Sequence, residues 1–486
     1  MLLRAFRRWA VRLLVVAIVL AIAAFAIRIL ETERGPDLQL WHTFVPKDMH
    51  ADEIDKATWA DYIAAEDKLF QSVRENVTDK LDISQQTPLN RYFSGSPIYP
   101  ERFATNWNRS YVLMPEGTPK GAVVLLHGLT DTPYSLRHIA ESYRQQGFVA
   151  IGIRMPAHGT VPAALTDVKW EDWMAATRLA VRQARLLGGD VPLHLVGFSN
   201  GGALAMKYAL DALDNAQLAK PARVILISPM IGVTRFARFA GLAGWPAFFP
   251  AFAKAAWLGI VPEFNPFKYN SFPVNGGRQS FELTRALQQQ ITRDAANNRL
   301  DALPPILTFQ SVMDSTVSTR AVITALYEHL PANGSEVVLF DLNQAESFGP
   351  LLRTSSYLAL SRLLPPPPRR YTATIVTNVA VDSLDTLART TLAGQTQETT
   401  ELLGIEYPAD IFSLSHVALP FPMSDSLYGR YPQPKDQYGI SLGAFAARGE
   451  RAVLVVGLDS LMRLASNPFY PYMLKRINAK IAMDTP

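Results

Sequence analysis

The sequence predicts an α/β fold in which a mostly parallel central sheet is covered by helices on both faces. Three observations lead to this prediction. From residue 110 onward, short apolar runs alternate with segments of helical periodicity. The runs are continuously apolar, which is typical of strands that are buried on both faces. The chain has 486 residues, of which 48% are hydrophobic and 19% charged, so it can bury a large core.

The first 34 residues have the features of an export or anchoring signal. Arginines precede an apolar run from Leu13 to Ile27, which Arg28 closes. We expect an uncleaved signal-anchor, a transmembrane helix in the inner membrane, with the remaining chain on the periplasmic side, because the arginines should stay inside. The small residues of Ala24-Phe25-Ala26 leave open a cleaved signal peptide and release to the periplasm.

Charge and cysteine content exclude several classes of function. Residues 1–34 hold six Arg and two Glu, which together account for the net charge of +4 of the whole chain. The remainder is neutral, so no nucleic-acid partner is expected. The chain has no cysteine, which excludes disulfides, thiolate metal sites and a cysteine nucleophile.

After a polar linker, residues 35–109 are predicted to form a helical extension, with an amphipathic helix at residues 54–76. Residues 110–486 are predicted to form the main domain. Its expected strands are the runs SYVLMP, AVVLLHG, FVAIGIRMP, LHLVGFS, RVILISP, ILTFQSVMD and EVVLFDL. A parallel sheet of this kind binds ligands at the carboxyl ends of its strands.

The stretch Gly197-Phe198-Ser199-Asn200-Gly201 lies at one such end, between an apolar run and a helix-like segment. In a nucleophile elbow the serine lies at positive φ on a turn so tight that only glycine fits two residues before and after it. The following amide, here that of Asn200, then faces a developing oxyanion. The alternative is a glycine-rich turn without a chemical role.

The segments LLHGLTDTPYS, RMPAHGT, GFSNGG and SVMD together resemble the α/β-hydrolase superfamily, in its esterase, lipase and monoglyceride-lipase-like branch. The resemblance covers about residues 110–342 and is closest to bacterial membrane-anchored hydrolases. It implies an α/β-hydrolase fold, a helical cap at about residues 230–303, and Ser199 as the nucleophile. It also implies that the amide of Leu129 is the second oxyanion donor. We expect His127 and His158 to be structural.

The acid of the triad should follow a later strand. Asp314 ends the run ILTFQSVMD, and the chain order of serine, acid and histidine favours it. The alternative for Asp314 is a helix N-cap, and Asp341 is the second candidate for the acid.

The histidine departs from the pattern of the branch, because none follows the run EVVLFDL directly. Among the eight histidines, His416 alone comes after Asp314, follows a strand-like run and opens a loop. We therefore expect His416 to be the base. This implies an insertion at about residues 351–410 that returns the chain to the active site and carries a strand at residues 373–380.

The cap is rich in aromatic residues, which predict either an apolar pocket for an acyl chain or ordinary packing on the body. They are Phe236, Phe239, Trp245, Phe248, Phe249, Phe252 and Trp257.

The expected function is a serine hydrolase that cleaves carboxylic esters, of small-molecule or lipid type, through an acyl-enzyme. No metal or organic cofactor is required. Peptidase, thioesterase or acyltransferase activity could use the same triad. A hydrolase fold without activity, acting as a membrane-tethered interaction module, is the alternative from another class.

Overall fold

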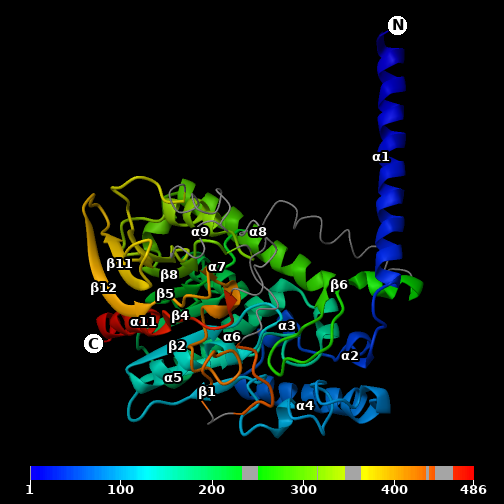
Figure 1. The fold of residues 1–486 in the computed structure, drawn as a ribbon, viewed down its shortest axis with the longest axis horizontal. Helices are drawn as coiled ribbons and strands as arrows, with labels where there is room; N and C mark the ends of the chain where they lie inside the picture. Colours follow the sequence, from blue (N-terminus) through cyan, green and yellow to red (C-terminus); the bar gives the residue numbers. More distant parts are fainter. Residues whose placement is uncertain are drawn as a thin grey trace.

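A 10-stranded sheet forms the centre of the protein (Figure 1). The structure is a computed structural model that describes residues 2–232, 250–314, 316–344, 363–433, 437–443 and 463–485. The strand order is β1-β3-β2-β4-β5-β8-β9-β10-β11-β12. Neighbouring strands are parallel from β3 through β10, and β1, β11 and β12 pair antiparallel at the edges. The prediction of a mostly parallel sheet is confirmed.

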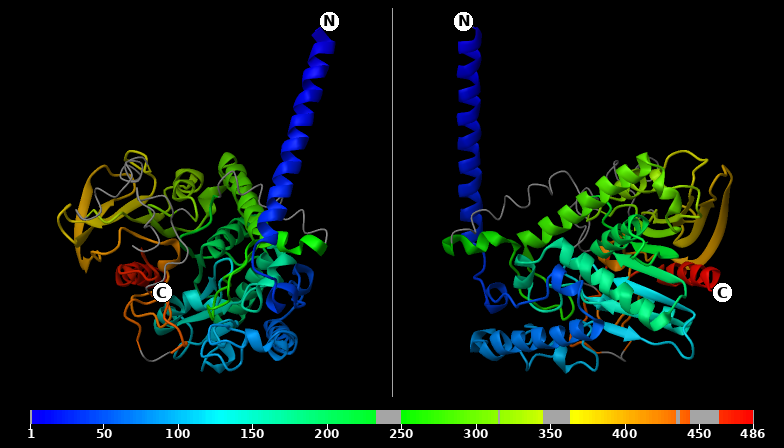
Figure 2. Two further views of the ribbon diagram at one scale, coloured as in Figure 1. Left: turned by 45° about the vertical axis from the view of Figure 1, so that its right-hand side comes forward. Right: turned by 180° about the vertical axis from the view of Figure 1, so that it is seen from behind.

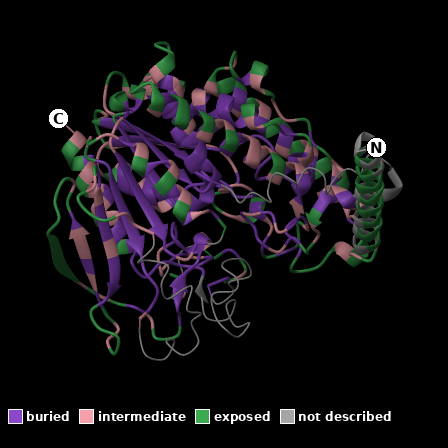
Figure 3. Ribbon diagram, turned by 90° about the horizontal axis from the view of Figure 1, so that it is seen from above, coloured by how far each residue is buried: buried purple, intermediate pink, exposed green. Residues whose placement is uncertain are grey.

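The strands correspond to the apolar runs of the sequence. They are β1 (Tyr111–Leu113), β2 (Gly121–Leu126), β3 (Phe148–Ile153), β4 (Leu193–Phe198), β5 (Arg223–Ile227), β8 (Ile306–Ser311), β9 (Glu336–Phe340), β10 (Thr372–Asn378), β11 (Asp385–Thr391) and β12 (Glu398–Glu406). Every residue of the strands β2, β3, β4, β5, β8 and β9 is buried. Figure 3 shows this buried centre, with exposed residues on the outer helices and on the edge strand β12.

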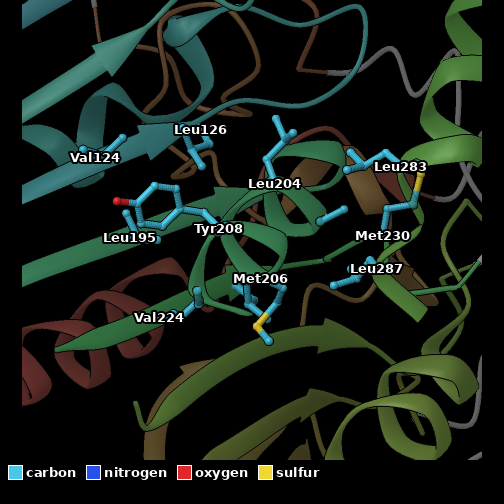
Figure 4. Packing of buried hydrophobic residues seen from close by; sticks show 14 of the residues in the cluster. Val124, Leu126, Leu195, Leu204, Met206, Tyr208, Val224, Met230, Leu283 and Leu287 are labelled. Carbon is cyan, nitrogen blue, oxygen red and sulfur yellow. The ribbon is translucent and has the colours of Figure 1, made fainter. Parts of the chain in front are cut away.

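Successive strand residues point to opposite faces of the sheet, so both faces carry apolar side chains. Helices cover both faces and bury these side chains. Val124 and Leu126 pack with α6 (Trp170–Gly188), α7 (Asn200–Asp214) and α8 (Val274–Ala296), as Figure 4 shows for part of this cluster. Val123 and Leu125 pack with α5 (Arg137–Gln145) and α11 (Tyr470–Asp484) on the other face. The helix α9 (Thr319–Ala325) follows β8.

The N-terminal extension contains α2 (Leu40–Thr43), α3 (Ala51–Ile54) and α4 (Trp59–Asn76). The predicted helix at residues 54–76 is shorter than expected, because Thr58 caps α4. The Thr58 hydroxyl accepts a hydrogen bond from the amide of Asp61, and the Asp61 carboxylate accepts one from the amide of Thr58.

A buried ion cluster joins this extension to the sheet. The Arg154 guanidinium, one residue beyond β3, donates to both oxygens of Asp48 at 2.8 and 3.0 Å, and to Glu66 at 3.0 Å. Arg154 is 1% exposed and Glu66 2% exposed. Because both carboxylates belong to the extension, the extension neutralises a charge that lies within the main domain.

The N-terminal helix α1 (Leu2–Glu33) projects away from the rest of the protein (Figures 1 and 2). Its large apolar side chains that the structure describes are exposed, as in Leu13, Val16 and Leu20. Within the described residues, no helix has the combination of length and apolarity that crossing a membrane requires. A helix at this position is confirmed, whereas the prediction that it is transmembrane finds no support in the described residues.

The segment after β9 adds strands to the edge of the sheet before the chain reaches His416. The strand expected at residues 373–380 is confirmed as β10, and β11 and β12 continue the sheet beyond it. Two small sheets pair β13 (Ser413–Leu414) with β14 (Arg463–Leu464), and β6 (Trp257–Gly259) with β7 (Phe272–Pro273). The short 3₁₀ helices are η1 (Thr78–Lys80), η2 (Ile83–Gln85), η3 (Pro100–Arg102), η4 (Pro133–Leu136), η5 (Pro162–Thr166), η7 (Pro250–Ala256), η8 (Arg299–Ala302), η9 (Tyr327–His329) and η12 (His416–Ala418).

Candidate active site

Ser199 lies on a sharp turn between β4 and α7, with φ of 55°. A Cβ atom on Gly197 would lie 2.3 Å from the carbonyl oxygen of Gly201, and a Cβ on Gly201 would lie 1.9 Å from that of Leu126. Both distances are far below van der Waals contact, so neither position accepts a side chain. The turn is therefore strained in the way a nucleophile elbow requires, and the glycines make it possible.

The structure brings the three predicted triad residues together. His416 Nδ1 lies 2.8 Å from Asp314 Oδ2, and His416 Nε2 lies 2.9 Å from Ser199 Oγ. A carboxylate only accepts hydrogen bonds, so His416 Nδ1 carries the proton and Nε2 accepts from the serine hydroxyl. The three side chains are buried, and the His416 ring stacks on Phe198 at 5.3 Å. His416 is thus held in the tautomer that accepts a hydrogen bond from Ser199, the arrangement that a general base requires.

Asp314 is oriented by three hydrogen bonds besides the one to His416. Its Oδ1 accepts from the amides of Thr316 at 2.9 Å and Val317 at 3.0 Å, and its Oδ2 accepts from the Gln310 side chain at 3.1 Å. The N-cap of α9 is Ser318, whose hydroxyl accepts from the amide of Ala321. Asp314 is therefore hydrogen-bonded to His416, and the alternative of a helix N-cap at Asp314 does not hold.

Asp341, the second candidate for the acid, has other partners. Its carboxylate accepts hydrogen bonds from the amide of Leu342 and from the side chains of Thr377 and Gln344. Burial raises the pKa of Asp341, and these donors oppose the rise. The residue lies in a polar cluster between β9 and β10, not beside His416.

The loop after β2 lies against the nucleophile. A Cβ on Gly128 would meet the Cβ of Ser199 at 3.2 Å, so glycine allows the loop to approach Ser199 and brings the amide of the next residue, Leu129, to this side of the sheet. Asn200 is the first residue of α7, and the first amides of a helix have no carbonyl partner within it. The Asn200 side chain is fixed by the Ser280 hydroxyl of α8 at 2.6 Å. The two predicted oxyanion donors thus belong to the two segments that flank Ser199.

His127 holds this loop in place, as the sequence predicts. Its Nδ1 donates to the carbonyl of Gly128 at 2.9 Å, and its Nε2 accepts from the amide of Met155 at 3.0 Å. Burial lowers the pKa of His127 well below its usual range, with a further contribution from His158. Burial also lowers the pKa of His158 to about 4, and its Nδ1 donates to the carbonyl of Pro156. Both histidines are therefore neutral structural side chains.

A cavity of about 70 Å³ lies near the triad, since Phe198, one of its lining residues, stacks on the His416 ring. Phe198 and Val417, which line it, are the sequence neighbours of Ser199 and His416. The other lining residues come from the loop after β2, from the cap and from the C-terminal segment: Asp131, Phe264, Asn265, Lys268, Tyr269, Asn270, Phe421, Tyr428, Leu442 and Ala465. The lining of the cavity is mostly apolar, with a few polar groups, as in small-molecule sites, but its volume is well below the roughly 300–1,000 Å³ of such sites.

The aromatic residues of the cap, predicted either to form an acyl pocket or to pack on the body, lie for the most part outside the described residues. Phe236, Phe239, Trp245, Phe248 and Phe249 lie outside the described residues, as does the side chain of Phe252. Trp257 packs against the N-terminal extension, where its ring meets that of His42 at 4.8 Å. Packing on the body is thus the correct alternative for Trp257.

Sequence reasoning missed several residues of the cavity. Phe421, Tyr428, Leu442 and Ala465 follow His416 in the chain, and no periodicity indicated that this segment folds over the site. Among the residues that the structure describes, no group of three or more acidic or histidine side chains is placed to hold a metal ion.

Residues 117–342 match the family model described as serine aminopeptidase, S33 (Hydrolase_4). The thermostable monoacylglycerol lipase of Bacillus sp. (strain H-257) is 32% identical over 94 residues, which are 19% of this chain and only 36% of that lipase. The matched family region contains Ser199 and Asp314 and ends before His416. The assignment of the histidine therefore depends on geometry alone.

Two solved structures are among those found to be similar to part of the chain. The structure reported for the metagenome-derived lipolytic enzymes LipS and LipT has a TM-score of 0.38 and 20% identity, and the alignment covers 48% of this chain and 86% of that chain. The monoacylglycerol lipase of Paleococcus ferrophilus has a TM-score of 0.35 and 19% identity, with 48% of this chain and 87% of that chain covered.

Proposed function

We propose that this chain, a member of the α/β-hydrolase superfamily, is a serine hydrolase that cleaves carboxylic esters through an acyl-enzyme. The observation that carries the proposal is the continuous chain of hydrogen bonds from Ser199 through His416 to Asp314, at 2.9 and 2.8 Å. It joins residues 217 and 102 positions apart in the sequence. Nucleophilic catalysis requires this order of hydrogen bonds among a serine, a histidine and an aspartate, which explains why the three distant segments meet at one buried place.

In the proposed mechanism, Ser199 Oγ attacks the ester carbonyl carbon while His416 Nε2 takes its proton. The carbonyl oxygen becomes negative, and the amides of Leu129 and Asn200 stabilise it by about 3 kcal/mol each. The bond between the carbonyl carbon and the alkoxide oxygen then breaks, and His416 donates the proton to the departing alkoxide. The acyl group remains bound to Ser199 as an ester. Water, activated by the same histidine, releases the acid. Asp314 stabilises the imidazolium that forms in both steps.

Two observations support an acyl or lipid-like ester as the substrate. The cavity beside Ser199 is walled by side chains such as Phe198, Phe421 and Leu442, which suit an acyl chain. Part of the chain is also similar to a monoacylglycerol lipase. Each methylene buried in such a site contributes about 0.8 kcal/mol, or roughly fourfold in kcat/KM. We expect turnover of p-nitrophenyl esters to rise from acetate to octanoate. A flat or falling profile would contradict an acyl site.

The test of the reaction class is covalent labelling of the purified protein with a fluorophosphonate probe, followed by esters, thioesters and aminoacyl amides. We expect labelling at Ser199 and turnover of the esters, with Ser199→Ala as the unlabelled control. Faster turnover of aminoacyl amides or of thioesters would replace ester hydrolysis by peptidase or thioesterase activity. Preferential transfer of the acyl group to an added alcohol would assign an acyltransferase. A folded but unlabelled protein would favour a non-catalytic interaction module.

We further propose that α1 anchors the protein in the inner membrane, with the hydrolase domain on the periplasmic side. The arginines before Leu13 and the exposed apolar side chains of α1 support this proposal. The test is expression in a bacterial host with an epitope after Pro486. We expect carbonate-resistant membrane association and digestion of the epitope by protease in intact spheroplasts. Release to the periplasm of a protein cleaved near Ala26 would assign a signal peptide instead, and protection of the epitope would refute the outward orientation.

A further inference from the structure

Asp131 lies in the wall of the cavity beside the triad, four positions after His127. Its amide donates to the carbonyl of Gly128 at 3.3 Å, which closes the turn that carries Leu129. The backbone of Asp131 is therefore fixed relative to the oxyanion loop, and the residue borders the same space as Phe198 and Val417, the neighbours of Ser199 and His416.

The loop that carries Asp131 is held rigidly on both sides. The carbonyl of Thr130 accepts from the amide of Tyr269 at 2.8 Å, and the Thr132 hydroxyl donates to the carbonyl of Phe267 at 2.9 Å. Thr130 itself has a positive φ of 62°. These hydrogen bonds fix the backbone on either side of Asp131, and the burial of its side chain limits the rotamers that the carboxylate can adopt.

The carboxylate is buried without full hydrogen bonding. Asp131 is 3% exposed, and its Oδ2 has no hydrogen-bond partner among the residues that the structure describes. A buried polar atom in this condition costs roughly 1–3 kcal/mol of stability, so such atoms call for a reason. Burial raises the pKa of Asp131, although the Lys268 ammonium and the Ser135 hydroxyl oppose the rise.

Two neighbouring polar side chains are engaged elsewhere. Asn265 donates to the Tyr428 hydroxyl at 2.6 Å and accepts from the amide of Phe267 at 3.0 Å. The Tyr269 hydroxyl donates to the carbonyl of Ala157 at 3.1 Å. The cavity thus combines an apolar wall with the polar residues Lys268 and Asn270 and with Asp131, whose buried Oδ2 has no hydrogen-bond partner among the described residues.

We infer that Asp131 is a specificity-determining residue that accepts a hydrogen bond from a hydroxyl or ammonium group of the bound ester. The inference rests on the proposed ester hydrolysis and adds a requirement to it. The preferred substrate is amphipathic, with an alkyl or acyl part against the aromatic wall and a hydrogen-bond donor a short distance from the scissile carbonyl. A purely alkyl ester leaves Asp131 Oδ2 unsatisfied in the complex and is disfavoured for that reason.

The test compares esters of matched size that differ in one terminal group. On the acyl side these are methyl heptanoate, methyl ω-hydroxyhexanoate and methyl ω-aminohexanoate. On the alcohol side they are butyl butyrate and ω-hydroxypropyl butyrate. We expect kcat/KM of the wild-type protein to favour the donor-bearing member of one series by roughly 10- to 100-fold, the usual size of a hydrogen bond to a charged group. The series that discriminates shows which part of the ester lies against Asp131, and the aminohexanoate distinguishes an ammonium from a hydroxyl.

Asp131→Leu should remove the preference for the donor-bearing ester, which is measured as a ratio within each matched set so that any change in overall turnover cancels. Asp341→Asn is the matched control, because Asp341 is also a buried carboxylate at the end of a strand but lies outside the cavity. It should keep the wild-type preference. If Asp131→Leu does not fold, Asp131→Asn serves in its place and should lose the preference for the ammonium ester, since the amide carries no charge.

A pH series of the wild-type protein gives a second readout. The preference for the ammonium ester should fall on acidification, beginning above the usual range of an aspartate because burial raises the pKa of Asp131. Using the ratio of two esters cancels any loss of activity common to both. Equal kcat/KM within every matched set, or a preference that survives in Asp131→Leu, would overturn the inference. Absence of labelling and of all turnover would refute the proposed hydrolase function as well.

Discussion

Replacing Asp314 by asparagine should stop His416 from acting as a base while the shape of the side chain at position 314 is kept. Asp314 Oδ1 accepts two backbone amides, from Thr316 and Val317, so the asparagine must place its oxygen there. Its NH₂ group then takes the place of Oδ2, which now accepts from His416 Nδ1 and from Gln310. Two donors face an NH₂ donor, and His416 can avoid the conflict only by moving its proton to Nε2.

The magnitude follows from this change of tautomer. With its proton on Nε2, His416 cannot accept the proton of Ser199, and other triad enzymes lose about 10⁴-fold in kcat for the same substitution. That corresponds to about 5.5 kcal/mol of transition-state stabilisation. Losing a charged hydrogen bond in a buried place should also lower the free energy of unfolding by about 1–3 kcal/mol.

The assay is kcat/KM on a p-nitrophenyl ester at neutral pH, together with the rate of fluorophosphonate labelling and a thermal unfolding curve. Asp341→Asn is the control, since the Asp341 carboxylate is buried but bonded to Leu342, Thr377 and Gln344. We expect it to keep activity close to that of the wild type. A folded Asp314→Asn variant within tenfold of wild-type activity would show that Asp314 does not orient the base.

Three further predictions follow from the same geometry. His416→Ala should reduce turnover about as much as Ser199→Ala, since triad members act as one unit, and a folded His416→Ala variant with near-normal ester turnover would exclude it as the base. Gly201→Ala should lower the free energy of unfolding by at least about 2 kcal/mol in denaturant titrations, because the new Cβ would lie 1.9 Å from a carbonyl oxygen. Gly259→Ala is the control and should change the free energy of unfolding little, because the new Cβ has open space around it. Equal effects of the two substitutions would contradict the reasoning. Burial raises the pKa of Asp425, but ion pairing with Arg137 and a hydrogen bond from His138 outweigh burial and leave the pKa below the usual range. The contribution of ionised Asp425 to stability is therefore present above about pH 4 and is lost on acidification below it. Thermal unfolding at pH 7 and pH 3 should therefore show a smaller pH dependence for Asp425→Asn than for the wild type, and an unchanged difference would count against this assignment.

The sheet could be predicted from sequence because its strands are buried on both faces, which leaves continuous apolar runs such as β2, β4 and β9. The elbow could be predicted because close backbone approach leaves no residue but glycine at 197 and 201. His416 followed from position along the chain, since so few histidines lie beyond Asp314. These signals are local, or depend only on chain order.

The cavity could not be predicted in the same way. Its walls come from the loop after β2, from residues 264–270 and from the C-terminal residues Val417, Phe421, Tyr428, Leu442 and Ala465. Contacts between such distant segments leave no periodic pattern. Trp257 shows that composition alone does not reveal what an aromatic side chain contacts. An aromatic residue of the cap has the same composition signal whether it lines the active site or packs on the N-terminal extension, as Trp257 does.

The ion cluster around Arg154 determines how short a functional version of this protein can be. A truncated protein that began at residue 110 would keep every strand and the whole triad, yet it would lack Asp48 and Glu66, the two carboxylates that neutralise Arg154. The deletion would remove these charge-assisted hydrogen bonds and would also expose the apolar core surface that Ile54 and Tyr62 cover. The next residue, Met155, donates the hydrogen bond that fixes His127 beneath the oxyanion loop. The smallest self-sufficient catalytic unit therefore begins before Asp48, and removal of α1 alone is the shortening that the fold should tolerate.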